Sequence, residues 1–245
     1  MKLNSNPENH NLYSVRIVTT TPKVTEEKLF SYRRSYMGIS LDNSVFQGKS
    51  LEALLLWMTD NFEQSLVVVG DYLWRFNEQI FAGLDTDEAS NKAQQLGDAF
   101  IQQTSGLFEK MTDKKVHLTR WKSHLKTAEF NKAKNKLDNL FASDSDFRTS
   151  VERDAFYFVK RQLRQNRKFA VETEQAVMLS SQYLLEEIAV FSALSEQGWN
   201  VELYPGPELK ALVDIAKGKY ADVPQGLKER INVELRLDEN CSNRL

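Results

Sequence analysis

The feature that most constrains the fold is a short apolar run, Leu66-Val-Val-Val69, which Gly70-Asp71 ends at once. The run lacks the alternation of polar and apolar residues that marks a strand with one face in water. Strands that are apolar on both faces are typical of a parallel sheet with helices packed on each side. The run therefore predicts an α/β protein whose reactive groups gather where the parallel strands end.

The segments on either side of this run alternate between strand and helix patterns. Further strands are predicted at residues 15–18, 35–39, 116–121, 201–204 and 231–237, and helices at residues 51–58, 71–81, 88–111, 126–141, 144–166, 172–197 and 208–217. Either Asp144 or Ser145 can cap the helix that begins there. Such alternation predicts a Rossmann-like parallel sheet flanked by helices. Because we find no internal repeat or linker, residues 1–245 are interpreted as a single domain, with disordered tails at 1–10 and 238–245.

Composition restricts the chemistry available to this domain. The single cysteine, Cys241, excludes a disulfide framework or thiolate metal cluster within the chain, and His10, His117 and His124 lack the spacing of a metal site. No Walker sequence and no Gly-x-Gly-x-x-Gly is present, so no nucleotide cofactor is expected. No apolar run approaches the roughly 20 residues that span a bilayer, and residues 1–10 have no signal-peptide core. We therefore expect a cytoplasmic protein with no metal and no membrane partner.

Charge is distributed unevenly along the chain. Residues 114–168 contain 15 Lys and Arg against 6 Asp and Glu, a local charge of +9, and because the whole chain carries −2 the remainder carries −11. Four basic residues fall on one stripe of the helix predicted over 146–167, and two more lie four apart on the preceding helix. These six are Arg153, Lys160, Arg164, Arg167, Lys132 and Lys136. The pattern fits either a solvated surface or a face that binds a polyanion.

A serine follows the second predicted strand, in the sequence Gly38-Ile-Ser40-Leu-Asp42-Asn43. Its place after a buried strand is where α/β enzymes carry reactive groups. The sequence differs from the hydrolase nucleophile elbow, which has glycine at position 42, and the few histidines argue against a Ser-His-Asp triad. Ser40 is therefore either a nucleophile that is activated in another way or part of a turn or helix cap.

Two further motifs carry polar groups that can bind a ligand. In Tyr183-Leu-Leu-Glu186-Glu187, residues 183 and 187 share one helix face and can bind an ammonium group together, whereas Glu186 is expected in solvent. The alternative is a core tyrosine beside a surface glutamate. In the strand at 201–204, Glu202 and Tyr204 share the face opposite the apolar residues. The alternative there is an interfacial tyrosine at a strand end.

Together these motifs resemble those of the tRNA-dependent cyclodipeptide synthases. Gly38-x-Ser40-x-x-Asn43 resembles the family's first motif, Tyr183-x-x-Glu186-Glu187 its helical motif, and Leu203-Tyr204-Pro205 the strand of its second catalytic tyrosine. Asp71-x-Leu73-x-Arg75-x-Asn77 is similar too, and the order, separations and length fit across nearly the whole chain. With Pro205, the chain resembles the branch of the family that has proline at this position rather than glutamine.

The resemblance implies a fold like the catalytic domain of class Ic aminoacyl-tRNA synthetases, a monomer, and no metal or cofactor. It also implies a ping-pong mechanism that uses two aminoacyl-tRNAs per cycle: Ser40 takes the first aminoacyl group, the amine of the second attacks the acyl-serine, and the dipeptidyl enzyme cyclises to a 2,5-diketopiperazine. Tyr183 and Glu187 would hold the aminoacyl ammonium, and Tyr204 would assist proton transfer. Gly38, Asn43 and Glu202 would lie in the substrate site. A hydroxyl of the tRNA's terminal ribose could take the serine proton, so that no histidine is needed.

Two other functions fit the same motifs. A non-catalytic, tRNA-binding relative of a class I synthetase would keep the basic helices but would form no acyl-serine. A serine acyl hydrolase would turn over simple esters without RNA. If the basic residues bind the acceptor stem of a tRNA, affinity should fall steeply with salt, because each phosphate contact releases counterions.

Overall fold

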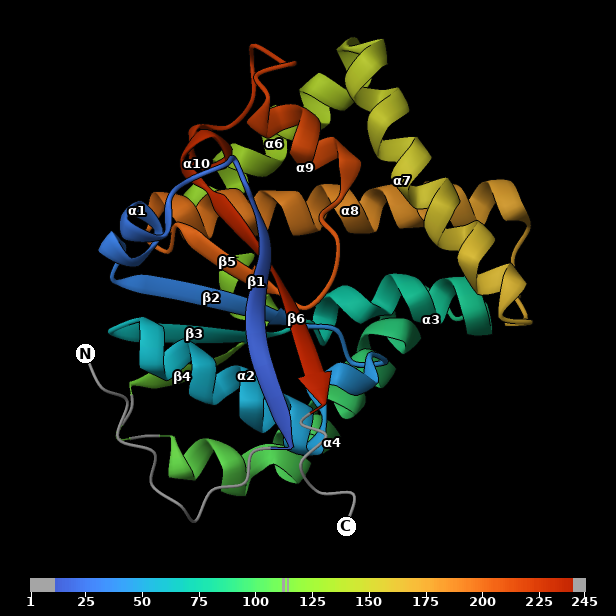
Figure 1. Ribbon diagram of the computed structural model, residues 1–245. Coiled ribbons are helices and arrows are strands. Elements are labelled where there is room, and N and C mark those ends of the chain that lie inside the picture. The colour runs from blue at the N-terminus through green and yellow to red at the C-terminus, as the bar shows by residue number, and fades with distance from the viewer. Residues whose placement is uncertain (1–11, 112, 114, 240–245) are drawn as a thin grey trace.

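The computed structural model describes residues 12–111, 113 and 115–239. Within these residues six strands form one sheet in the order β1-β6-β5-β2-β3-β4 (Figure 1). The five strands from β6 to β4 run parallel, whereas β1 pairs antiparallel with β6 at the sheet edge. The predicted Rossmann-like α/β fold is confirmed, with the correction that the first strand is antiparallel to its neighbour. Its partner is the last strand of the chain, and no local sequence pattern reveals so distant a pairing.

The strands are β1 (Tyr13–Thr21), β2 (Arg34–Ile39), β3 (Gln64–Val69), β4 (Val116–Arg120), β5 (Val201–Tyr204) and β6 (Ile231–Glu239). The helices are α1 (Glu26–Ser31), α2 (Gly48–Asn61), α3 (Arg75–Ala82), α4 (Thr86–Lys110), α5 (Trp121–His124), α6 (Ala128–Ser143), α7 (Ser145–Arg164), α8 (Thr173–Glu196), α9 (Lys210–Ala216) and α10 (Gln225–Glu229). Two 3-10 turns, η1 (Ser44–Phe46) and η2 (Tyr72–Trp74), follow β2 and β3. Of the two predicted candidates, Asp144 caps α7, because its carboxylate accepts from two backbone amides of the first turn.

Several boundaries differ from the predictions for local reasons. Trp121 begins α5 rather than ending β4, and the helix predicted from residue 71 starts as η2. The sequence does not predict α1, α5 or α10, because four to six residues carry too little periodicity to detect. Asp238 and Glu239 are not part of a disordered tail, since they belong to β6 and pair with β1. The remainder of the two predicted tails, 1–10 and 240–245, lies outside the described residues.

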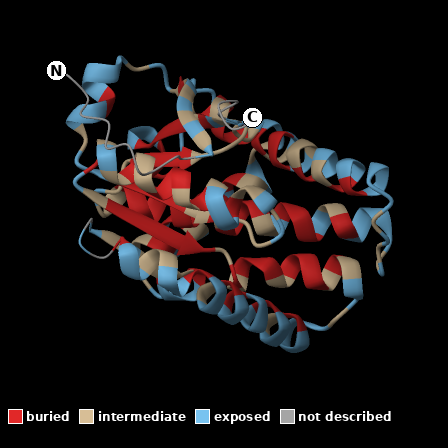
Figure 2. Cartoon of the chain, turned by 60° about the horizontal axis from the view of Figure 1, so that its bottom comes forward, coloured by how far each residue is buried: buried red, intermediate tan, exposed pale blue. Residues whose placement is uncertain are grey.

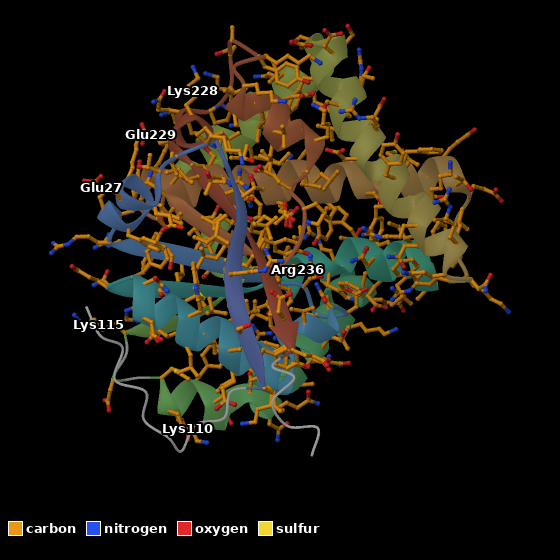
Figure 3. The ribbon with its side chains drawn as sticks, in the orientation of Figure 1. Glu27, Lys110, Lys115, Lys228, Glu229 and Arg236 are labelled. Atoms are coloured by element: carbon orange, nitrogen blue, oxygen red, sulfur yellow. The ribbon has the colours of Figure 1, made fainter. Side chains whose placement is uncertain are left out.

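Helices cover both faces of the sheet, and successive residues of β3 show how. Val67 and Val69 pack on the side covered by α1, α2 and α4. Leu66 and Val68 pack on the other side, against α3 and the helices from α5 to α10. Figure 2 shows the buried residues along the sheet and on the inner sides of the helices. Exposed charged residues such as Lys110 lie at the periphery (Figure 3). This double covering explains why β3 is apolar on both faces.

The longest buried element is α8, which crosses one face of the sheet (Figure 1). Its 24 residues extend over about 36 Å, and α3, α6, α7 and α10 pack against it. Among the described residues it is the one helix long and apolar enough to cross a membrane, but 72% of that stretch is buried inside the fold. A helix this apolar and this deeply buried is the core helix of the protein, although its first half keeps exposed residues such as Met178 and Gln182.

The carboxyl ends of the parallel strands lie at one edge of the sheet, and this edge holds the loop that begins at Ser40. Where β2 and β3 end, the backbone amide of Gly70 donates to the carbonyl oxygen of Ile39 at 3.0 Å. A Cβ atom at position 70 would lie only 2.7 Å from that oxygen. Glycine is therefore required for the close approach that fixes the end of β2 against β3.

Candidate active site

Ser40 leads the loop from β2 into η1 and is partly buried. Its hydroxyl donates to Oδ1 of Asp42 at 3.3 Å. Asn43 caps the turn that follows: its side-chain oxygen accepts from the amide of Val45 at 3.1 Å. The turn interpretation applies to the Ser40 backbone, because its carbonyl oxygen accepts from the amide of Asn43 at 3.2 Å, and the cap interpretation applies to Asn43. The Ser40 hydroxyl takes part in neither, and among the described residues its hydrogen bond is to Asp42.

Tyr183 and Glu187 lie one turn apart on α8 and are both half-buried. Burial raises the pKa of Tyr183 well above its usual range, and the nearby Glu187, Tyr204 and Asp42 add to the effect. Burial also raises the pKa of Glu187 to about 8, helped by the Glu202 carboxylate and opposed by Arg230. Glu187 is thus largely a neutral acid at pH 7, and a cation bound beside it would favour its ionised form.

Tyr204 is the last residue of β5, and its side chain lies between the Ser40 loop and α8. Its ring centroid lies 6.1 Å from that of Phe46 in η1. Burial raises the pKa of Tyr204, the nearby Glu187 raises it further, and a hydrogen bond with the Asn43 side chain partly offsets this. The predicted tyrosine and glutamate of α8, the tyrosine of β5 and the loop after β2 therefore come together at the carboxyl edge of the sheet.

Glu202 lies on the predicted face of β5 but is buried in an ion network. It pairs in register with Tyr36 of β2, whose hydroxyl donates to Glu202 at 3.0 Å. Arg230 donates from Nε to Glu202 at 2.5 Å and from Nη1 to Glu208 at 2.5 Å. The side chains of Glu202 and Arg230 are only 6% and 3% exposed, so neither is a solvated rim residue. Oε2 of Glu208 is buried without a hydrogen-bond partner among the described residues.

Gly38 leaves space between this network and Ser40. Side chains alternate between the two faces of a strand, so positions 36, 38 and 40 lie on the same side of β2 and its continuation. A Cβ atom at Gly38 would meet no other atom within 4 Å. The charges of Glu202 and Arg230 both shift the pKa of Glu187, so α8 borders the region around this ion network. The open space at Gly38 therefore lies between the chain positions of Ser40 and Tyr36, whose hydroxyl contacts Glu202.

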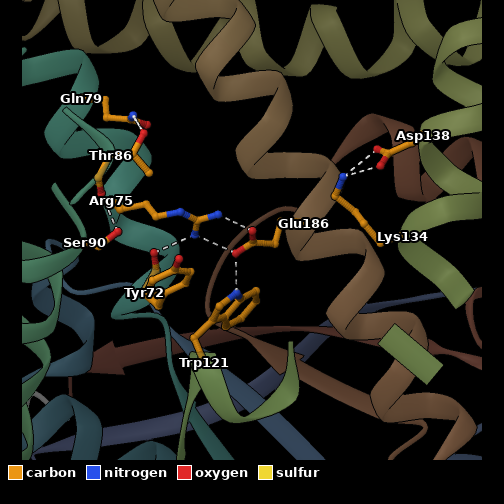
Figure 4. Close-up of polar contacts among 9 residues, drawn as sticks. All are labelled: Tyr72, Arg75, Gln79, Thr86, Ser90, Trp121, Lys134, Asp138 and Glu186. Atoms are coloured by element: carbon orange, nitrogen blue, oxygen red, sulfur yellow. Dashed lines mark hydrogen bonds and ion pairs between the residues drawn. The ribbon is translucent and has the colours of Figure 1, made fainter. Parts of the chain in front are cut away.

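Glu186 is not in solvent, which corrects the prediction. Its side chain is 8% exposed and accepts two hydrogen bonds from the Arg75 guanidinium, at 2.9 and 2.5 Å (Figure 4). Trp121 donates to it from Nε1 at 3.0 Å, and the Arg75 guanidinium stacks over the rings of Tyr72 and Phe76. The prediction is wrong because Gln182 is the last exposed residue of α8, and beyond it the helix is packed on every side, including the side of Glu186.

Comparison with known families decides where this chain belongs. The sequence model of the family described as cyclodipeptide synthase matches residues 20–196, from the end of β1 to the end of α8. The chain belongs to the cyclodipeptide synthase family. A search of the curated proteins finds no match.

Solved structures agree with this assignment. The synthase is similar to a cyclodipeptide synthase from Fluoribacter dumoffii, with a TM-score of 0.77, 20% identity, and coverage of 94% of this chain and 99% of the other. It is also similar to a cyclodipeptide synthase from Candidatus Glomeribacter gigasporarum bound to Phe-tRNAPhe, with a TM-score of 0.63, 18% identity, and coverage of 86% of this chain and 90% of the other. A third similar structure is that of a Mycobacterium tuberculosis protein, which relates cyclodipeptide synthetases to type I tRNA synthetases. Its TM-score is 0.64, its identity 16%, and the match covers 93% of this chain and 94% of the other. At these identities the likeness concerns the fold, and the branch assignment from Pro205 stays a prediction.

The six predicted basic residues of the synthase do not form one compact patch. Lys132 pairs with Glu196, the last residue of α8, at 3.8 Å, and Lys136 pairs with Asp222 at 2.6 Å. Arg167 instead precedes α8 and pairs with Asp42 at 3.1 Å, beside Ser40. Lys132 therefore lies beside the last residue of α8, whereas Arg167 lies before its first residue and beside the Ser40 loop.

The remaining three basic residues lie along α7. Arg153 pairs weakly with Asp214 at 3.9 Å, whereas Lys160 and Arg164 are exposed and form no ion pair with any described residue. Leu163 on the same helix is 45% exposed. The outer surface of α7 therefore offers free positive charge close to the end that leads to Arg167.

Several residues of the site escape detection from the sequence. Arg230 lies far along the chain from every motif, and Glu208 follows Pro205 closely but belongs to no motif; only the fold brings Arg230 to Glu202 and Glu208. Asp42 sits inside the first motif, at a position the motif leaves unspecified. Among the described residues no group of three or more His, Cys, Asp or Glu could hold a metal ion.

Proposed function

We propose that this synthase joins two aminoacyl groups, delivered by two aminoacyl-tRNAs, through an acyl-Ser40 intermediate. The observation that carries the proposal is the convergence of the Ser40 loop with Tyr183, Glu187 and Tyr204 at one edge of the sheet. The Phe-tRNAPhe bound to the Candidatus Glomeribacter gigasporarum relative supports aminoacyl-tRNA as the donor. An aminoacyl ester is already activated, so the reaction needs no ATP.

Glu187 is suited to handle the amino groups of the substrates. An α-amino group has an ordinary pKa of about 7.7–8.0, and burial brings the pKa of Glu187 to about 8. A proton can therefore pass between the two with little change in free energy. Glu187 would bind the first aminoacyl group as its ammonium, and would then accept a proton from the second so that a neutral amine attacks the acyl-serine.

The two tyrosines would act as neutral hydroxyls. Burial raises the pKa of both Tyr183 and Tyr204, so each keeps its proton at neutral pH. Tyr183 would hold the substrate amine together with Glu187. Tyr204, which is linked to the Ser40 loop through Asn43, would relay a proton when the dipeptidyl group cyclises and leaves Ser40.

The space at Gly38 would receive the side chain of the first aminoacyl group. Beyond it lie Tyr36, Glu202 and Arg230 rather than apolar residues. Burying an apolar side chain against such groups gains little, whereas a polar or cationic side chain can take up their hydrogen bonds. We therefore propose that the first amino acid is polar or cationic.

The acceptor stem of the tRNA would approach along α7. Lys160 and Arg164 carry free positive charge there, and the helix ends near Arg167 and the Ser40 loop. Lys132 and Lys136 would at most contact a more distant part of the tRNA. We further propose that the synthase acts as a cytoplasmic monomer.

The decisive experiment incubates the protein with a pool of charged tRNAs and measures the mass of the peptide that contains Ser40. We expect an aminoacyl increment on that peptide, cyclic dipeptides in solution, and neither with Ser40→Ala. Cyclic dipeptide from the alanine variant would exclude the acyl-serine. Binding of tRNA without an increment would identify a non-catalytic relative, and turnover of simple esters without RNA would identify a hydrolase.

A further inference from the structure

We propose that Asp42 is a catalytic residue that accepts the proton of Ser40, and that Arg167 positions it. This inference rests on the proposed acyl-Ser40 reaction. Oδ1 of Asp42 accepts the hydrogen bond of the Ser40 hydroxyl at 3.3 Å, and Oδ2 accepts from Nη1 of Arg167 at 3.1 Å. The nucleophile therefore already has a carboxylate partner, and this partner is held from a segment 125 residues away.

Arg167 is itself held firmly, which makes it suited to fix another side chain. Its guanidinium lies 3.9 Å from the ring centroid of Phe81 and also donates to Oε1 of Gln162 at 3.3 Å. The backbone that carries it is anchored too, because its amide donates to the carbonyl oxygen of Gln162 at 3.1 Å. A guanidinium held in this way favours the orientation of Asp42 in which one oxygen faces Arg167 and the other faces Ser40.

Asp42 also faces the substrate site rather than only its own loop. Its charge contributes to the raised pKa of Tyr183, so the carboxylate lies within electrostatic reach of α8. The side chains of Asp42 and Arg167 are 37% and 36% exposed, so a bound acceptor end can cover both. Covering the pair removes water and strengthens the hydrogen bond between Ser40 and Asp42.

The proton transfer balances without any further reactant. The Ser40 hydroxyl proton passes to Oδ1 of Asp42 while Oγ forms its bond to the carbonyl carbon of the aminoacyl ester. The bond from that carbon to the terminal ribose oxygen then breaks. The ribose oxygen keeps the electron pair of that bond and takes the proton from Asp42. One ester is exchanged for another, and Asp42 returns to its starting state.

The test measures single-turnover acylation of Ser40, using the aminoacyl-tRNA that the wild-type protein is found to accept from a charged tRNA pool. Asp42→Asn keeps the shape of the side chain but removes its basicity. We expect its maximal acylation rate to fall about 10²–10⁴-fold, as for loss of a general base, while the half-saturating concentration of aminoacyl-tRNA changes less than threefold. Asp42→Glu should recover part of the rate. Asp60→Asn, at an exposed position of α2, is the matched control.

Arg167 requires a second readout, because it could also contact tRNA. If it acts through Asp42, Arg167→Gln lowers the maximal rate in the wild-type background but has no further effect on Asp42→Asn. Exposed Lys168→Gln is the control for loss of a charge. Acylation of Asp42→Asn within threefold of the wild-type rate would overturn the proposal and leave the proton to the ribose hydroxyl. If the wild-type protein forms no acyl-Ser40 at all, the proposed function itself fails.

Discussion

The pKa of Glu187 predicts an unusual dependence of stability on pH, and Glu187→Gln exposes it. In the folded protein this pKa is about 8, whereas that of an unfolded glutamate is about 4.3. Below about pH 4 both states hold the proton, so Glu187 costs nothing. Between these two pKa values only the folded state keeps the proton. The free energy of unfolding therefore falls by up to about 1.4 kcal/mol for each pH unit of increase. Above about pH 8 the folded protein must ionise the buried group, and the cost is then complete.

The difference between the folded and unfolded pKa values corresponds to a loss of about 5 kcal/mol in the free energy of unfolding. Glu187 is half-buried, so solvent screening reduces this, and we expect about 2–5 kcal/mol. The wild type and the Glu187→Gln variant share every other titrating group, so most of their common pH dependence cancels in the difference. The variant should be close to the wild type at pH 5 and the more stable protein at pH 9.

Urea unfolding at intervals between pH 5 and 9 measures this difference, provided that the slope m is unchanged. Glu174→Gln is the matched control, because Glu174 lies exposed on the same helix. A difference between wild type and Glu187→Gln that stays constant within about 0.5 kcal/mol would show that the carboxyl group is ionised at neutral pH. Glu187 could then bind an ammonium but not exchange a proton with it.

Three further predictions concern other parts of the site. Glu186→Gln should destabilise the protein by about 3–5 kcal/mol in urea unfolding, because it breaks a buried ion pair with Arg75; a loss below about 1 kcal/mol would contradict the described pairing. Glu202→Gln should shift the cyclic dipeptides, identified by mass, toward less polar residues, and an unchanged product spectrum would place Glu202 outside the pocket. Reversing Lys160 and Arg164 to Glu should weaken tRNA binding and lower its log–log salt slope by about 0.7–0.9 per lost phosphate contact, while a small activated aminoacyl ester still acylates Ser40. Unaltered binding would make α7 a solvated surface.

Much of the fold follows from local patterns in the sequence. The apolar run of β3, a cap at Asp144 or Ser145 and the long periodic helices are predicted because each depends on neighbouring residues. The antiparallel β1 is not, because its partner β6 lies more than 200 residues away. The same distinction applies to the site: Ser40, Tyr183 and Tyr204 stand in recognisable motifs, whereas Arg230 reaches Glu202 only through the order of strands.

The two adjacent carboxylates of α8 show how one buried helix can serve structure and chemistry together. Glu186 and Glu187 point to different sides of α8, and both sides are packed. Glu186 meets Arg75 and Trp121, which supply three hydrogen bonds to its charged form. Glu187 has no such partner among the described residues, and Arg230, whose charge lowers the pKa of Glu187, already binds Glu202 and Glu208. Arg75 thus stabilises one negative charge in the core, whereas burial raises the pKa of the other carboxyl group to about 8. The ammonium of an aminoacyl group would be the counter-ion that the folded protein leaves out.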